Sequence, residues 1–101
     1  KIEKNTKHAK HLYTILIDKK KIGIDRDHFM MKLHDKGVGT GVHYRSIPSH
    51  TFYKKKFNWK ETDYKNSCLI GDQTVSLPLS PNLSSRDMDK IFSSIEKIIK
   101  I

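Results

Sequence analysis

The sequence predicts a small two-layer α/β (α+β) sandwich, in which helices cover one face of a small sheet. Three observations support this fold class. Residues 12–17 are almost continuously apolar, residues 74–77 form a second short strand-like run, and residues 84–99 carry a long amphipathic pattern. Strands and helices that alternate in this way pack as one layer on another. At 101 residues the chain is long enough for one modest core.

The first strand and the first helix follow one another closely. Aromatic and β-branched residues predict a strand over residues 11–17. Its near-continuous apolarity favours a central strand that is covered on both faces. The charged residues 18–23 are expected to form an exposed turn. Asp25 is a suitable N-cap for a helix through Lys36, and Gly37 is suited to the left-handed conformation that ends a helix.

The middle of the chain predicts another strand and two short helices. Residues 40–44 alternate with a period of two, which indicates a strand with one face on the core. Pro48 prevents this strand from continuing as a central one. Short helices are expected over residues 51–57 and 63–70, and Gly71 is expected to end the second of them.

The last predicted elements are a strand and a helix. Residues 74–77 predict the third strand, which Pro78 breaks. Ser84 and Asp87 form a capping-box pattern, with aspartate in place of the commoner glutamate. A continuous apolar face follows at helical spacing. It consists of Met88, Ile91, Phe92, Ile95, Ile98 and Ile99.

The composition is basic, with 20 Lys and Arg against 11 Asp and Glu and a net charge of +9. This balance raises the possibility of a nucleic acid or an anionic ligand as partner. The lysines are scattered, however, and no RNA-binding signature accompanies them, so we expect mainly solvated surface lysines, and nucleic acid is the less favoured partner. No apolar run reaches the roughly 18–20 residues of a membrane span, so no membrane partner is expected.

The numbers and positions of cysteine and histidine bear on disulfide bonds, cellular compartment and metal binding. Cys68 is the single cysteine, which excludes an intramolecular disulfide and favours the reducing cytoplasm. The six histidines do not follow a ligand spacing with cysteine or carboxylate, so no metal site is expected. The chain begins with lysine rather than methionine, and we expect it to be a fragment of a longer protein.

Polar side chains gather where the predicted strand over residues 40–44 ends. They are His43, Tyr44, Arg45 and His50. A guanidinium can bind a carboxylate or a phosphate through two parallel hydrogen bonds, and the imidazoles can donate to sugar or phosphate oxygens. The residues alone support two interpretations equally: a binding loop, and a loop whose polar groups cap its own backbone.

Several motifs occur in the order found in one known family. They are His-Leu-Tyr at residues 11–13, Gly-Val-Gly-Thr-Gly-Val-His-Tyr at 37–44, Pro-Ser-His at 48–50 and Ser-Leu-Pro-Leu at 76–79, with the amphipathic helix after them. This ordered set resembles the C-terminal small domain of the DegT/StrS-type (DegT/DnrJ-like) sugar aminotransferases. The resemblance covers nearly the whole chain and implies a mostly antiparallel sheet, as in the C-terminal domain of fold-type I pyridoxal-phosphate aminotransferases. It makes residues 1–10 a linker remnant and residues 11–101 the small domain.

The resemblance also implies a function. Members of this family use pyridoxal phosphate to move an amino group from glutamate onto a nucleotide-linked keto-sugar, in amino-sugar and cell-surface polysaccharide biosynthesis. Their small domain closes over an active site at a dimer interface, so the implied partners are the nucleotide sugar, glutamate and a second copy in a homodimer. The cofactor lysine belongs to the family's large domain. We therefore assign no catalytic or cofactor-binding residue here, and expect the isolated fragment to be inactive.

Carried over residue by residue, the resemblance makes His43 and Tyr44 residues of the substrate site. Arg45 and His50 rank next, and His11 is a weaker candidate. A basic β-α-β binding module for RNA or for an acidic partner is the alternative, and steeply salt-dependent binding to RNA would favour it. A regulatory ligand-binding domain is a third possibility.

Overall fold

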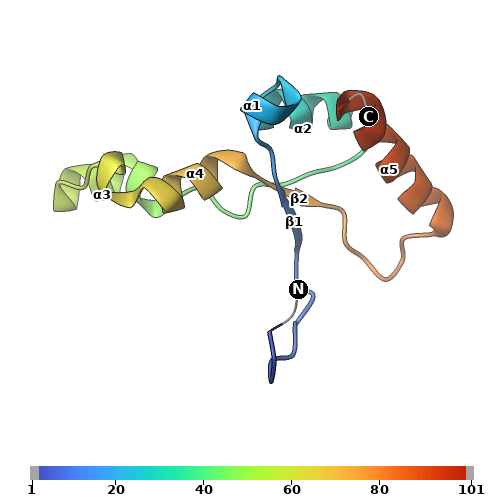
Figure 1. Cartoon of the computed structure of the whole chain (residues 1–101), viewed down its shortest axis with the longest axis horizontal. Coiled ribbons are helices and arrows are strands. Elements are labelled where there is room, and N and C mark those ends of the chain that lie inside the picture. The colour runs from blue at the N-terminus through green and yellow to red at the C-terminus, as the bar shows by residue number, and fades with distance from the viewer. Residues whose placement is uncertain (1–2, 100–101) are drawn as a thin grey trace.

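The structure is a computed structural model that describes residues 3–99. Its centre is a two-stranded antiparallel sheet, in which β1 (Tyr13–Leu16) pairs with β2 (Thr74–Leu77) (Figure 1). The register places Tyr13 opposite Leu77 and Leu16 opposite Thr74. This small antiparallel sheet with its surrounding helices confirms the predicted α+β class.

The helices form two groups. At one end of the sheet lie α1 (Lys19–Ile22), α2 (Arg26–Asp35) and α5 (Ser85–Ile99) (Figure 1). On the other side, η1 (Ile47–Ser49), α3 (Thr51–Phe57), η2 (Glu61–Tyr64) and α4 (Lys65–Gln73) form a projecting arm. η1 and η2 are 3₁₀ helices.

The hydrophobic core lies between the sheet, α2 and α5. Phe29, Leu33 and Val75 are completely buried. The core is completed by Ile17, Val38, Leu77 and Ile91. The amphipathic face of α5 therefore has the role that its spacing predicts, although Phe92 on this face remains half-exposed.

Side-chain caps explain where α2 and α5 begin. The Asp25 carboxylate accepts a hydrogen bond of 3.0 Å from the backbone N–H of His28. This bond, together with a bond from the His28 side chain, holds the pKa of Asp25 below its ordinary value. Before α5, the backbone N–H of Ser84 donates to Asp87 Oδ2 (2.9 Å), and that of Asp87 donates to Ser84 Oγ (3.2 Å). The predicted capping box is confirmed.

Gly37 ends α2 as expected. Its φ of +70° is left-handed, and its N–H donates to the carbonyl of His34 at 2.8 Å. The turn predicted over residues 18–23 instead contains α1, because the Asp18 carboxylate accepts the N–H of Lys20 and caps this short helix.

The strand predicted over residues 40–44 is wrong. Within the described residues, only Gly41 pairs, through one isolated bridge to Ser76. Glycine at positions 39 and 41 weakens the strand propensity of the segment, and the chain turns into η1 soon afterwards. The sheet consequently has two strands and a single bridge.

β1 is also more open than its apolarity predicts. The side chains of Tyr13 and Leu16 are 57% and 54% exposed. Among the described strands, β1 has β2 as its partner on one edge, and nothing else pairs with it. The prediction of cover on both faces is not met by residues 3–99, which the structure describes.

Gly71 does not end its helix. α4 continues through it to Gln73, and Gly71 packs against Ser46 in the loop before η1. The predicted stop is replaced by a close approach between two segments.

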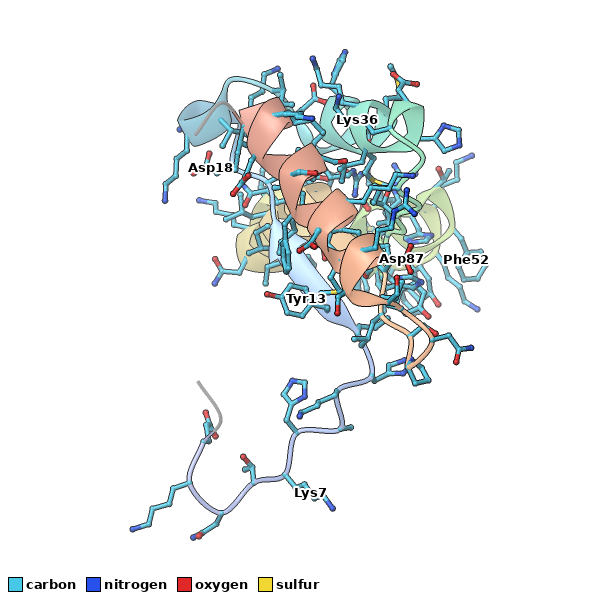
Figure 2. All side chains as sticks on the ribbon, turned by 90° about the vertical axis from the view of Figure 1, so that its right-hand side faces the viewer. Lys7, Tyr13, Asp18, Lys36, Phe52 and Asp87 are labelled. Carbon is cyan, nitrogen blue, oxygen red and sulfur yellow. The ribbon has the colours of Figure 1, made fainter. Side chains whose placement is uncertain are left out.

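The overall shape is elongated. The radius of gyration is 16.0 Å, above the roughly 13 Å of a compact chain of about 100 residues. The arm accounts for part of this excess, and the segment around Lys7 extends away from the other elements (Figure 2). No helix in the described part of the chain is long and apolar enough to cross a membrane.

Candidate functional site

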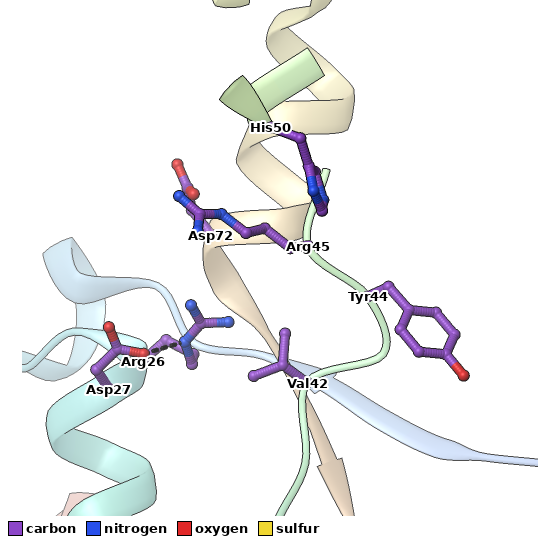
Figure 3. Close-up of a pocket in the computed structure, with 7 residues that line it drawn as sticks. All are labelled: Arg26, Asp27, Val42, Tyr44, Arg45, His50 and Asp72. Carbon is purple, nitrogen blue, oxygen red and sulfur yellow. Dashed lines mark hydrogen bonds and ion pairs between the residues drawn. The ribbon is translucent and has the colours of Figure 1, made fainter. Parts of the chain in front are cut away.

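The five residues predicted to bind substrate lie in two neighbouring grooves. We call the first the arginine groove; it is lined by Arg26, Asp27, Val42, Tyr44, Arg45, His50 and Asp72 (Figure 3). The second, the histidine groove, is lined by His11, Leu12, Gly39, Thr40, Gly41, His43, Ser76, Leu77, Pro78 and Leu79. Three of the five predicted residues thus line the first groove, and His11 and His43 line the second.

The two grooves meet at His43 and Tyr44. His43 lines the histidine groove, and Val42 and Tyr44 line the arginine groove. The rings of His43 and Tyr44 lie edge to face, with their centroids 5.0 Å apart. The two grooves are therefore neighbours on the surface, joined at this pair of rings.

Arg26 forms one side of the arginine groove and is held in place by several hydrogen bonds. Its side chain is only 16% exposed, and its Nε donates to Asp27 Oδ1 at 2.5 Å. Its terminal nitrogen donates to the carbonyl oxygens of Gly71 and Thr74, at 3.3 Å each. Arg26 thus connects the start of α2 to the end of α4 and the start of β2.

Arg45 is the cation that remains available in this groove. Its side chain extends toward Asp72, and that of Tyr44 points outward at the rim (Figure 3). Within residues 3–99, no carboxylate lies within salt-bridge distance of Arg45. With His50 beside it, Arg45 can bind a phosphate or a carboxylate from outside the chain.

The volume of the arginine groove, ≈ 590 Å³, lies within the range of small-molecule sites. Two carboxylates, Asp27 and Asp72, line the groove with the two arginines. Since Arg26 already binds Asp27 and two carbonyls, an arriving anion would meet mainly Arg45 and His50.

In the histidine groove, the side chains of His43 and Ser76 form a hydrogen bond with each other. His43 Nδ1 lies 2.8 Å from the hydroxyl oxygen of Ser76, and Ser76 is only 5% exposed. His11, in contrast, is exposed and makes no side-chain hydrogen bond with the described residues. His11, the weakest of the five predicted site residues, is thus on the solvent-exposed side of the groove.

The residues that sequence reasoning did not find are Arg26, Asp27, Asp72 and Ser76. Arg26 and Asp72 are far apart in sequence and meet only in the folded chain. Ser76 stood in a recognised motif, Ser-Leu-Pro-Leu, but nothing local in that motif indicates a histidine partner.

A covalently bound aldehyde cofactor would need a lysine amine in one of the two grooves, and a metal ion would need several ligating side chains close together. Neither groove is lined by a lysine, so neither offers an amine to an aldehyde group. Within residues 3–99, no three His, Cys, Asp or Glu side chains cluster closely enough to hold a metal ion.

Comparison with known proteins gives consistent matches. The model of the DegT/DnrJ/EryC1/StrS aminotransferase family matches residues 1–96. The spore coat polysaccharide biosynthesis protein SpsC of Bacillus subtilis (strain 168) is 37% identical over 95 residues, which are 93% of this chain and 24% of that protein. The uncharacterized protein MJ1066 of Methanocaldococcus jannaschii is 34% identical over 98 residues, which are 97% of this chain and 25% of that protein.

Solved structures match as well. The apo form of Spr1654 from Streptococcus pneumoniae, described as a sugar aminotransferase, has a TM-score of 0.76 and 25% identity over 89% of this chain and 22% of its own. Helicobacter pylori PseC, an aminotransferase involved in the biosynthesis of pseudoaminic acid, has a TM-score of 0.73 and 27% identity over 89% of this chain and 24% of its own. The chain spans about a quarter of the length of the relatives that it matches.

Proposed function

Because this chain belongs to the DegT/DnrJ/EryC1/StrS aminotransferase family, we propose that it is the C-terminal small domain of a pyridoxal-phosphate-dependent sugar aminotransferase. The full-length enzyme transfers an amino group from glutamate to a nucleotide-linked keto-sugar, for amino-sugar or cell-surface polysaccharide biosynthesis. The observation that carries this proposal is the family match over residues 1–96, which includes both grooves. The names of SpsC and PseC, which refer to polysaccharide and pseudoaminic acid biosynthesis, support the sugar as substrate.

The arginine groove is suited to the anionic part of such a substrate. A nucleotide sugar carries phosphates, and the guanidinium of Arg45 can bind a phosphate through two parallel hydrogen bonds. His50 adds a second polar contact, and Tyr44, which is 75% exposed, offers its ring and hydroxyl at the rim. In this proposal Tyr44, Arg45 and His50 bind and orient the substrate.

The cofactor is held by residues outside this chain. Neither groove contains a lysine, so these two grooves do not fit the aldehyde end of pyridoxal phosphate. When bound, pyridoxal phosphate supplies the electron sink for the transfer. In this proposal the residues of this chain bind the sugar nucleotide and help to enclose it. The isolated 101 residues are expected to be inactive.

The same proposal assigns contacts to the exposed apolar side chains. Tyr13, Leu16, Phe52 and Phe57 are each at least 50% exposed. Such residues support packing of the small domain, residues 11–101, on the rest of the enzyme and on a second copy in a homodimer. Residues 1–10 are the linker in this scheme. The free Cys68 favours a cytoplasmic enzyme.

The test is made on the full-length protein that contains this chain. Its absorbance spectrum should show a pyridoxal band that glutamate converts to that of the amino form. Mass spectrometry should then detect an aminated sugar nucleotide after addition of keto-sugar nucleotides with different bases. A protein with no such band, or with steeply salt-dependent binding to single-stranded RNA instead, would refute the proposal.

A further inference from the structure

The histidine groove contains a buried serine whose hydroxyl lies within hydrogen-bond distance of His43, one of the predicted substrate-binding residues. Ser76 of β2 is 5% exposed, and its Oγ lies 2.8 Å from His43 Nδ1. In the part of the chain that the structure describes, the His43 ring is the hydrogen-bond partner of this hydroxyl. A buried hydroxyl needs such a partner, because it would otherwise lose its hydrogen bonds to water.

The backbone fixes the two side chains at this distance. Gly41 and Ser76 exchange two backbone hydrogen bonds, of 3.1 and 2.8 Å. The His43 ring folds back over Gly41, so closely that a Cβ at Gly41 would lie 2.7 Å from His43 Cε1. The ring is therefore confined by Ser76 and by the bare Cα of Gly41.

We propose that Ser76 is a positioning residue, which holds His43 as the neutral tautomer with its proton on Nε2. The 2.8 Å distance does not itself fix the donor, but Nδ1 is the hydrogen-bond partner of this buried hydroxyl among the described residues. Donation from Ser76 Oγ–H to an unprotonated Nδ1 therefore pairs the hydroxyl proton, which would otherwise be left without an acceptor. In a neutral imidazole whose Nδ1 accepts, Nε2 carries the proton and donates. His43 then offers one N–H in the histidine groove to an oxygen of the substrate.

This inference rests on the proposed function, since it takes the keto-sugar nucleotide as the molecule that meets His43. It assigns a role to two residues, Ser76 and Gly41, that were not expected to contribute to the site. Ser76 supplies the hydrogen bond, and Gly41 leaves the space that the ring occupies. Neither residue needs to touch the substrate.

The tautomer is measured by NMR on the full-length enzyme with ¹⁵N-labelled histidine, and a His43→Gln variant identifies the signals. We expect the Nε2–H pattern for His43 in the native enzyme and loss of this single pattern in Ser76→Ala. The KM for the keto-sugar nucleotide should rise about threefold to tenfold, the size of one lost hydrogen bond, while the KM for glutamate stays unchanged.

Matched variants separate positioning from folding. Ser94→Ala removes another serine that is 5% exposed, on α5 and outside the histidine groove, and should change neither the tautomer nor KM. Ser76→Thr keeps the hydroxyl and should keep the native pattern. Gly41→Ala should displace the ring and raise the same KM, because the added methyl group meets the imidazole.

An Nδ1–H pattern in the native enzyme would overturn the inference, as would a Ser76→Ala enzyme with an unchanged His43 pattern. An unchanged KM for the sugar nucleotide in Ser76→Ala would also overturn it. If the full-length protein aminates no sugar nucleotide, the proposed function fails, and the NMR pattern still decides whether Ser76 sets the state of His43.

Discussion

Gly71 in α4 lies directly against Ser46 in the loop that follows Arg45. A Cβ at Gly71 would come 2.6 Å from the backbone nitrogen of Ser46 and 2.9 Å from its Cβ. The Ser46 hydroxyl also forms a 2.9 Å hydrogen bond with that of Ser67. These contacts hold the loop on α4, and so they set where Arg45 enters the arginine groove.

Gly71→Ala should lower the stability of the protein by about 1–3 kcal/mol, because the new methyl group meets backbone, which cannot move aside easily. The measurement is thermal or denaturant unfolding of the full-length enzyme. Gly39→Ala is the matched control, since no heavy atom lies within 4 Å of the Cβ that it would add. Equal unfolding midpoints for the two variants would contradict this prediction.

Arg26→Lys should cost about 1.5–3 kcal/mol, although it keeps the positive charge. The hydrogen bonds from the guanidinium to Gly71 and Thr74 are lost, because an ammonium group does not reproduce the planar fork. Arg86→Lys, at an exposed position on α5, is the control and should unfold like the native protein. A loss of stability of the same size in both variants would show that Arg26 does not join α2 to α4.

Arg45→Ala should raise the KM for the keto-sugar nucleotide about tenfold or more, as expected for the loss of a charge-assisted hydrogen bond in the site. Arg45→Lys should recover only part of this loss, because lysine cannot form the two parallel bonds. Steady-state kinetics with saturating glutamate give the values. If Arg45→Ala keeps the native KM, the arginine groove is not where the phosphates bind.

The capping box before α5 should give a pH-dependent contribution to stability. Hydrogen bonds from the Ser84 side chain and backbone lower the pKa of Asp87 in the folded protein. A carboxyl whose pKa is lower when folded stabilises the fold above its unfolded pKa, and this contribution disappears as the pH falls through the folded pKa. Asp87→Asn should therefore unfold more easily than the native protein at neutral pH.

The difference between Asp87→Asn and the native protein should shrink as the pH is lowered into the acid range below about 4. Unfolding midpoints of both proteins over a pH series provide the measurement. Asp89→Asn removes a neighbouring exposed carboxylate on α5, outside the capping box, and serves as control. A difference that stays constant from neutral to acid pH would contradict the assigned cause.

Local signals predicted the elements that are stabilised locally. The cap at Asp25, the left-handed Gly37 and the box of Ser84 and Asp87 all depend on residues within four positions of one another, and all are found in the structure. The spacing of apolar residues in α5 likewise reports one face of one helix. These features need no knowledge of the rest of the fold.

The errors concern contacts between distant segments. Gly71 resembled a helix stop, and its actual reason is the nearness of Ser46. The alternation over residues 40–44 resembled a strand, but only Gly41 meets a partner. The presence of Arg26 and Arg45 in one groove depends on where α2 and α4 lie. The residues around a given position in a single sequence do not indicate which distant segments will lie next to it in the fold.

β1 and β2 lie side by side in the fold, yet β1 begins at Tyr13 and β2 ends at Leu77. While the ribosome makes this chain, β1 leaves the exit tunnel long before its partner exists. Its apolar residues then form an unpaired edge, which another unfinished chain can join. The sheet can close only after Leu77 has left the tunnel, so β1 stays unpaired while residues 17–73, which lie between the two strands, are made.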